Sequence, residues 1–292
     1  MANPTSHATR FKEERLAALM RWLVPIQAAV TRKHDYADPT LLYVDGMAGA
    51  GVNHFGEESF DGSPLVMLEA LDALSVGGTL GTARSHLVAI ERDYRQWLEL
   101  SVNVARHAGY LHSASVTGQL EVSFPVRGCV GEGLHKVFSE RLRRNGGRVI
   151  YGLVFLDPTN PGDLVSAIDA VADVVNHRRA RLDVALWTST TQWKRVSKSQ
   201  PDHPSLSDIM GKLGRSRWLT SDVPKIPRCC DNSNAFQWQM FVGTKGDFDG
   251  WSKAGFHDTE SPTGRRLLAM ALKTRKEYQP PPEGQYELLH LR

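Results

Sequence analysis

Three stretches of the sequence carry a carboxylate at the end of an apolar run. Asp45, Glu91 and Asp157 end the runs LLYVD, HLVAIE and VIYGLVFLD. Open α/β proteins bind their ligands just beyond the carboxyl ends of such strands, and carboxylates there accept hydrogen bonds from ligand hydroxyl and amino groups. Asp45 is followed by the glycine-rich stretch GMAGAG. Because glycine lets the backbone turn sharply and approach a ligand closely, the sequence predicts a binding loop after Asp45.

The spacing of this loop distinguishes between two kinds of cofactor. The nicotinamide fingerprint is G-x-G-x-x-G with an acid ~20 residues further on, whereas this chain has G-x-x-G-x-G, and Glu91 lies 40 residues after Gly51. The stretch DGMAGAG fits better the S-adenosylmethionine loop of methyltransferases, which often reads D-x-F-x-G-x-G in nucleic-acid enzymes. A glycine turn that holds no ligand is the alternative. The candidate cofactor-binding residues of the loop are Asp45, Gly46, Ala48, Gly49 and Gly51.

Two further acids are candidates for contacts to an adenosyl group. Glu91 can accept both hydroxyls of a ribose, and the alternative is an exposed turn that caps a helix from Tyr94. The stretch 128–133, GCVGEG, follows another strand-like run. A loop there can pass an adenine ring, with Glu132 accepting from its amino group. An ordinary turn between a strand and a helix is the alternative.

The stretch FLDPTNP is the candidate catalytic loop. Pro158 fixes its own φ and restricts Asp157 to extended geometry, so the loop is stiff and suited to positioning an amine nucleophile. Enzymes that methylate exocyclic amines carry D/N-P-P-Y/F here, and only the first two residues match. Asp157, Pro158 and Asn160 are the candidate catalytic residues. The alternative is the start of a helix, capped by Asn160 or Asp163.

Taken together, these motifs resemble the three-Cys-motif partner proteins. That family's pattern is D-G-F-A-G-x-G, then G-S-P, an I/V-E strand end and L-D-P-Y/F-G. The chain has DGMAGAG, GSP at 62–64, IE at 90–91 and LDP at 156–158. The match covers roughly residues 10–190, and the basic amphipathic start with Lys12 and Trp22 also fits. The chain departs from the pattern at Met47 and at Thr159-Asn160.

The resemblance implies a class I S-adenosylmethionine-dependent methyltransferase with a Rossmann-like fold. The sequence itself favours the same architecture, because near-continuous apolar runs alternate with helical stretches. Such runs form a doubly wound, mostly parallel sheet with helices on both faces. Apolar spacing predicts a helix over 10–32, and the alternating run 236–243 predicts a late antiparallel strand in the edge region. We expect a single domain over 1–292.

Basic residues concentrate in one segment, which we expect to form an insertion or subdomain at about 192–228. It holds eight Lys or Arg and three Asp, whereas the rest of the chain has a net charge of −2. Lysine and arginine neutralise phosphates, and interleaved aromatic rings stack on unpaired bases. A solvated loop with one amphipathic helix is the alternative. The candidate nucleic-acid contacts are Lys194, Arg195, Arg215 and Arg217.

Composition limits the class of protein. The 292 residues are 41% hydrophobic and 23% charged with a net charge of +3, which is typical of a globular chain and not of a disordered one. No run of 18 apolar residues occurs, so no membrane span is expected, and the first residues lack a secretory signal. Cys129, Cys229 and Cys230 fit neither a disulfide framework nor a metal site, so we expect reduced thiols in a cytoplasmic protein.

Two functional hypotheses follow. The first is an S-adenosylmethionine-dependent methyltransferase that acts on a base of DNA or RNA, at an exocyclic amine. The second is a catalytically silent, methyltransferase-like module that binds nucleic acid or a protein partner. The intact glycine loop and Glu91 favour the first, and the altered Thr159-Asn160 pair favours the second.

Overall fold

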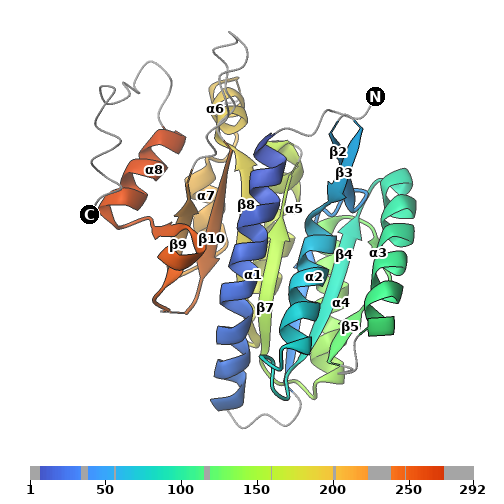
Figure 1. The fold of residues 1–292 in the computed structure, drawn as a ribbon. Helices are drawn as coiled ribbons and strands as arrows, with labels where there is room; N and C mark the ends of the chain where they lie inside the picture. Colours follow the sequence, from blue (N-terminus) through green and yellow to red (C-terminus); the bar gives the residue numbers. More distant parts are fainter. Residues whose placement is uncertain are drawn as a thin grey trace.

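The computed structural model describes residues 7–33, 39–55, 57–114, 119–158, 160–199, 202–222, 238–246 and 248–272. Strands and helices alternate along these ranges (Figure 1). The helices are α1 His7–Lys33, α2 Ser63–Val76, α3 Tyr94–Ala114, α4 Val130–Arg144, α5 Pro161–Val175, α6 Thr190–Ser199, α7 Leu206–Lys212, the short 3-10 helix η1 Trp251–Ala254 and α8 Pro262–Leu272. The strands are β1 Thr40–Asp45, β2 Val52–Phe55, β3 Glu58–Asp61, β4 Arg84–Glu91, β5 Leu120–Val122, β6 Val126–Arg127, β7 Ile150–Leu156, β8 Ala180–Ser189, β9 Arg217–Ser221, β10 Trp238–Thr244 and β11 Phe256–Asp258.

One large sheet organises the molecule. Its strand order is β11-β9-β10-β8-β7-β1-β4-β5, with β6 also paired to β4. Strands β8, β7, β1, β4, β5 and β6 pair in parallel, whereas β10 is antiparallel to both β8 and β9. The expected mostly parallel, doubly wound sheet is confirmed, as is the late antiparallel strand. Its place in the edge region is confirmed as well, because β10, β9 and β11 form the antiparallel side of the sheet.

The sheet is covered on both faces (Figure 1). Helices α1, α2 and α3 pack on one face, and α4, α5 and α7 pack on the other. Successive strand side chains point to opposite faces, so Leu41 and Tyr43 join the first core while Leu42 and Val44 join the second. This double burial explains why β1 and β7 have continuous apolar sequences rather than alternating ones.

Helix α1 is an integral part of the first core. Its apolar stripe, Leu16, Leu19 and Leu23, is fully buried against the sheet. One turn further along, Gln27 donates to Oδ2 of Asp183 at 2.9 Å. The helix predicted over 10–32 is therefore confirmed, and it extends over His7–Lys33.

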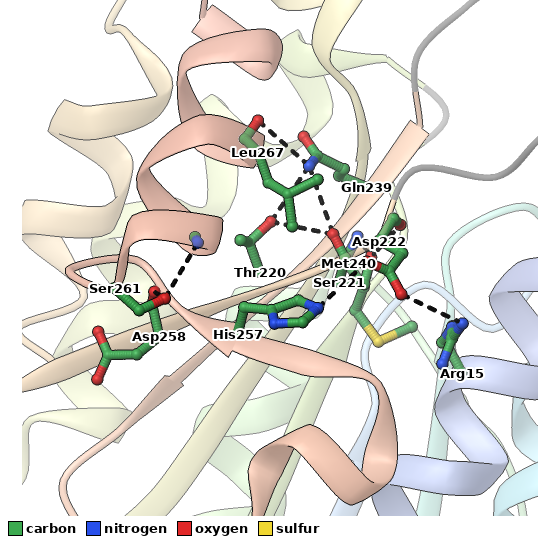
Figure 2. Close-up of polar contacts among 11 residues, drawn as sticks. Arg15, Thr220, Ser221, Asp222, Gln239, Met240, His257, Asp258, Ser261 and Leu267 are labelled. Carbon is green, nitrogen blue, oxygen red and sulfur yellow. Dashed lines mark hydrogen bonds and ion pairs between the residues drawn. The ribbon is translucent and has the colours of Figure 1, made fainter. Parts of the chain in front are cut away.

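The region formed by β9, β10, β11 and α8 is joined by polar contacts (Figure 2). The amide of Gln239 is fully buried and donates to Oγ1 of Thr220 at 3.2 Å. Asp222 contacts His257 Nε2 at 3.2 Å and the guanidinium of Arg15 at 3.8 Å. Because Arg15 belongs to α1, this pair connects the C-terminal strands to the N-terminal helix (Figure 2).

Two expectations concern features outside the sheet. Cys129 is an exposed free thiol, while Cys229 and Cys230 lie outside the described residues. In the part of the chain that the structure describes, no helix combines the length and apolar character needed to cross a membrane. The single-domain organisation over 1–292 stays a prediction.

Candidate active site

The three strand-end carboxylates lie together at the edge of the sheet that the carboxyl ends of its parallel strands form. Strand β1 lies between β7 and β4, with Asp45 in register with Phe155 on one side and Ala89 on the other. Asp45 and Glu91 are the last residues of β1 and β4, and Asp157 follows the last residue of β7. Parallel pairing thus brings together residues that are far apart in sequence.

The glycine loop after β1 spans the ends of both neighbouring strands. The Gly46 amide donates to the Phe155 carbonyl at 2.9 Å, and the Ala48 amide donates to the Ile90 carbonyl at 3.0 Å. Gly49 and Gly51 have φ values of 59° and 79°, which other L-residues rarely adopt. Glycine is therefore needed at both positions, because the loop adopts these φ values where it turns over the ends of the strands.

The Glu91 side chain joins the glycine loop to the end of β4 by hydrogen bonds. Its side chain is buried at 8% exposure. Oε2 accepts from the Gly49 amide at 2.8 Å, and Oε1 accepts from the Asp93 amide at 2.7 Å. Each carboxylate oxygen can accept a second hydrogen bond. The helix cap expected as the alternative role belongs to Asp93, whose Oδ1 accepts from the Arg95 and Gln96 amides.

Asp45 is fully buried under the loop. Oδ1 accepts from the Met47 amide at 3.2 Å, and no described residue bonds Oδ2. Burial raises the pKa of Asp45 to about 7, although a hydrogen bond from Ser63 and the charge of Lys12 act in the opposite direction. A buried acceptor without a partner is costly, so this oxygen is suited to a ligand donor or a proton.

Helix α1 adds an ammonium and a fourth carboxyl that sequence reasoning did not place in the site. Lys12, at 6% exposure, lies 2.6 Å from Oδ2 of Asp157 and 3.0 Å from Oε1 of Glu13. Burial alone would lower the pKa of Lys12, but the charges of Asp157 and Glu13 raise it. The signal was present in the sequence, because Lys12 continues the buried stripe of Leu16, Leu19 and Leu23 at helical spacing.

Glu13 is the second buried acid of this cluster. Burial raises its pKa to about 7 despite the attraction of Lys12. Oε1 accepts from the Asn53 amide group at 3.3 Å, and no described residue bonds Oε2. The carboxyls of Glu13, Asp45 and Asp157 thus surround the single ammonium of Lys12, an arrangement that favours a further positive charge.

The stretch 128–133 is not the loop that the sequence predicted. Only Gly128 and Cys129 precede α4, and Glu132 is an exposed residue of the first turn of that helix. A Cβ at Gly131 would lie 2.6 Å from Ala170, and one at Gly133 would lie 2.9 Å from Ile90. These glycines therefore allow α4 to pack closely against α5 and β4. A contact between Glu132 and an adenine stays a prediction.

Asn160 takes the capping role that was left open as the alternative. It is the N-cap of α5, where Oδ1 accepts from the Asp163 amide at 3.1 Å and Nδ2 donates to the Asp163 carboxylate at 2.7 Å. Both polar atoms of the Asn160 side chain take part in this cap, which accounts for an asparagine at this position, and its catalytic role stays a prediction. Pro158 is buried beside it, and Thr159 lies outside the described residues.

The basic segment does not form one surface. Lys194 and Arg195 lie on α6, which follows the carboxyl end of β8, and the placement of their side chains is outside the described part of the chain. Arg215 lies at the other end of β8, where its Nη1 donates to the Leu182 carbonyl at 2.6 Å. Arg217 pairs with Asp258 at 2.5 Å.

The structure places Arg215 away from the predicted nucleic-acid surface. It is only 7% exposed and also donates to the carbonyls of Leu213 and Val175 and to Oδ1 of Asn176. Four of the five N–H groups of this buried guanidinium donate to its own chain, so Arg215 has little capacity to bind a phosphate directly. Arg215 therefore does not belong to a nucleic-acid surface at the catalytic edge, whereas Lys194 and Arg195 stay candidates.

Aromatic rings lie on the same face of the sheet as Lys12. Phe11 of α1 has its ring centroid 6.3 Å from that of Trp187, and Trp187 lies 5.8 Å from Trp238 with an interplanar angle of 11°. Trp187 belongs to β8, the neighbour of β7, and Trp238 begins β10. The rings therefore border the side of the site on which Asp157 lies.

Among the described residues, one group could place ligand atoms around a metal ion. Asp61, Glu69 and His107 bring three such atoms within 4.8 Å of one another. His107 already pairs with Glu69 at 3.3 Å. Acidic groups at a surface commonly gather in this way without an ion.

Comparisons with known proteins gave matches to solved structures alone. No protein-family model and no curated protein matches the chain. A DUF574 family protein from Streptomyces avermitilis aligns over 82% of this chain and 83% of its own at 12% identity, with a TM-score of 0.43. The small RNA methyltransferase HEN1 aligns over 88% of this chain and 28% of its own at 13% identity, also with a TM-score of 0.43. An O-methyltransferase from Bacillus cereus, in complex with SAH, aligns over 78% and 80% at 11% identity, with a TM-score of 0.39.

Similarities of this size do not establish a shared function. The resemblance to the three-Cys-motif partner proteins stays a prediction. The candidate active site accordingly rests on the residues of this chain.

Proposed function

We propose that the chain is an S-adenosylmethionine-dependent methyltransferase that acts on a nucleic-acid base, with an exocyclic amine as the acceptor. One observation carries the proposal. The glycine loop held by Glu91 lies at the same sheet edge as the paired Lys12 and Asp157.

The residues of this edge fit the proposed cofactor. A Cβ added at Gly49 would have only Gln96 Oε1 near it, at 4.0 Å, so the backbone there is open to a ligand. Glu91 keeps acceptor capacity for the hydroxyls of a ribose. The unpartnered Oδ2 of Asp45 and the surplus of carboxyls around Lys12 suit a ligand that brings donors and positive charge. S-adenosylmethionine carries both, as an ammonium and a sulfonium.

When bound, S-adenosylmethionine supplies a methyl group already activated by the sulfonium, so the protein contributes mainly positioning. Lys12 holds Oδ2 of Asp157, and Pro158 stiffens the following turn. Oδ1 of Asp157 is then directed to accept an N–H of the amine and to orient the nitrogen lone pair. Glu13, with a pKa of about 7 and an unpartnered Oε2, can hold the proton that the amine loses.

The aromatic rings of Phe11, Trp187 and Trp238 support a planar acceptor. They border Asp157 from the neighbouring strands and from α1. Aromatic faces stack on unpaired bases, and Phe11 and Trp238 are only partly buried. A base in a duplex would have to be flipped out to reach this position.

The contacts of Asp157 and Pro158 also favour the second hypothesis, the catalytically silent module. The ammonium of Lys12 already neutralises Asp157, and the Pro158 turn continues into a helix cap at Asn160. A silent module that binds nucleic acid or a protein without transferring a methyl group would have this arrangement. Cofactor binding without turnover is the signature of that function.

Calorimetry with S-adenosylmethionine and its demethylated product, followed by transfer assays with a labelled methyl donor, tests the proposal. The acceptors are matched DNA, RNA and protein samples. We expect saturable cofactor binding and label in nucleic acid. Binding without label in any acceptor supports the silent module. Absence of binding at millimolar ligand overturns the proposed methyltransferase.

A further inference from the structure

A second charged cluster lies at the opposite edge of the sheet from the candidate active site. A cavity of about 600 Å³ opens where β8 begins and β10 ends. Its lining residues are Arg181, Gly214, Arg215, Ser216 and Lys245. Three of these five are cations, and they come from three separate segments of the chain.

Arg215 forms the buried wall of the cavity. Its guanidinium donates to the Val175 carbonyl at 2.9 Å and the Leu182 carbonyl at 2.6 Å. Val175 is the last residue of α5, so Arg215 satisfies the carbonyl end of that helix. Arg215 therefore supplies charge to the cavity, while four of its five N–H groups already donate to the chain.

Lys245 and Arg181 keep donors for a ligand. Within the described part of the chain, the Lys245 ammonium contacts the Val175 carbonyl at 3.2 Å and makes no other hydrogen bond. An ammonium has three protons. Arg181 is exposed, and its Nη1 donates to the Ala180 carbonyl at 3.1 Å. Both side chains thus have N–H groups to spare at the rim of the cavity.

The cations of this cavity repel one another. The pKa of Lys245 falls to about 8 because of burial and the charges of Arg215 and Arg181. The pKa of Arg215 falls to about 10, mainly through burial, with Asp183 opposing and Arg181 adding to the change. The partial negative charge at the end of α5 offsets part of this excess.

Asp183 is the carboxylate that faces these cations among the described residues. It is buried at 5% exposure and accepts from Gln27 at 2.9 Å. Hydrogen bonds from Thr244 and the Lys245 amide also reach it, and burial raises its pKa to about 6. Asp183 already accepts these hydrogen bonds, so its single negative charge does not neutralise the three cations.

We infer that this cavity binds a phosphate-type anion, held by the Lys245 ammonium and the Arg181 guanidinium against the buried charge of Arg215. The anion is either the phosphate of a small molecule or a phosphate of a nucleic-acid backbone. The inference does not depend on the proposed methyl transfer, because that site lies at the other edge of the sheet.

Calorimetric titration at low salt tests this inference with two probes, pyrophosphate and a short single-stranded DNA. The variants are Lys245→Met and Arg181→Met. The control is Lys212→Met, an exposed cation of α7 that pairs with Asp169. Losing a charge-assisted hydrogen bond weakens binding by about tenfold or more, so each cavity variant should lose at least that factor. The control should stay within about twofold of the wild-type affinity.

The two probes separate the possible sources of the anion. Pyrophosphate binding that depends on Lys245 and Arg181 assigns a small phosphate ligand, and binding of the DNA alone with the same dependence assigns a nucleic-acid backbone. If neither probe binds, or if the cavity variants and Lys212→Met behave alike, the inference is overturned. Thermal unfolding of each variant confirms that the fold is retained.

Discussion

The ammonium of Lys12 lies 2.6 Å from Oδ2 of Asp157, although 145 residues separate the two in the sequence. The Lys12 side chain is buried and that of Asp157 is partly buried, with side-chain exposures of 7% and 22%. This pair makes α1 a part of the candidate active site rather than a cover over the sheet, and its energy can be measured.

We predict that Lys12→Met strongly destabilises the protein. Removal of one partner leaves buried carboxyls without a counter-charge, which typically costs about 3–5 kcal/mol. Asp157→Asn in the same background should cost much less than it does in the wild type, because its partner is already gone. Urea unfolding of the two single variants and the double variant measures this coupling. Additive effects would show that the two groups do not interact.

The raised pKa of Glu13 predicts a pH-dependent stability. The folded state holds a proton on Glu13 up to about pH 7, whereas the unfolded chain releases it near 4.5. The unfolded state therefore binds fewer protons in this interval, and stability falls as pH rises from about 4.5 to 7. Glu13→Gln should remove about 1–3 kcal/mol of this fall. Asp45 and Asp183 contribute in the same direction.

Melting temperatures from pH 4.5 to 8 check this prediction. Glu14→Gln is the matched control, since Glu14 lies on the exposed side of the same helical turn. Equal pH profiles for Glu13→Gln and Glu14→Gln would contradict it.

Glu91→Gln should weaken S-adenosylmethionine binding by about 10- to 100-fold. The change removes the negative charge that accepts from the Gly49 amide and from a ligand hydroxyl, and such a hydrogen bond contributes about 1.5–3 kcal/mol. Calorimetry measures the affinity, and hydrogen exchange at the Gly49 amide reports whether the loop loosens. Glu99→Gln on the exposed face of α3 is the control. Unchanged affinity would remove Glu91 from the cofactor site.

Asp157→Ala should lower methyl transfer by roughly 10²–10³, by analogy with the loss of one oriented group that stabilises developing charge. Cofactor affinity should stay near that of the wild type. Asp157→Asn should be milder, because its amide oxygen still accepts. Single-turnover assays with labelled methyl donor give the rates. A folded, cofactor-binding Asp157→Ala protein with full activity would exclude Asp157 from catalysis.

Asn160→Ala separates capping from catalysis. Loss of an N-cap side chain costs about 0.5–2 kcal/mol, so the free energy of unfolding should fall by that amount. Transfer by the folded protein should stay near the wild-type rate because both polar atoms of Asn160 serve the cap. A large loss of rate without loss of stability would support the catalytic interpretation.

The sequence predicted the parts of the site that strand periodicity determines. Asp45, Glu91 and Asp157 end apolar runs, and parallel strands place such ends at one edge. The contacts of Lys12 and Glu13 depend on how α1 docks on the sheet, which periodicity alone does not give. The Lys12 position on the apolar stripe was the available signal.

Other errors have equally local causes. A glycine that allows close helix packing looks the same in sequence as one in a binding loop, so the sequence leaves both interpretations open for the stretch 128–133, where Gly131 and Gly133 serve packing. The sequence predicts one insertion or subdomain for the basic segment, but the segment runs from α6 at the carboxyl end of β8 to Arg215 at the other end of that strand. A count of charges along the sequence does not show that two parts of one segment lie at opposite ends of a strand.

The position of α1 in the core sets the order in which the molecule can be completed during synthesis. Helix α1 is translated before the strands that it covers, yet Lys12 pairs with Asp157 and Arg15 with Asp222. Its apolar stripe, including Leu16 and Leu19, lies in a core that also contains Phe155 and Met240 of strands translated much later. Non-local contacts of this kind slow folding and leave apolar surface exposed on the nascent chain. The candidate charge cluster thus assembles late in folding, so a chain that stops before β7 has no such centre.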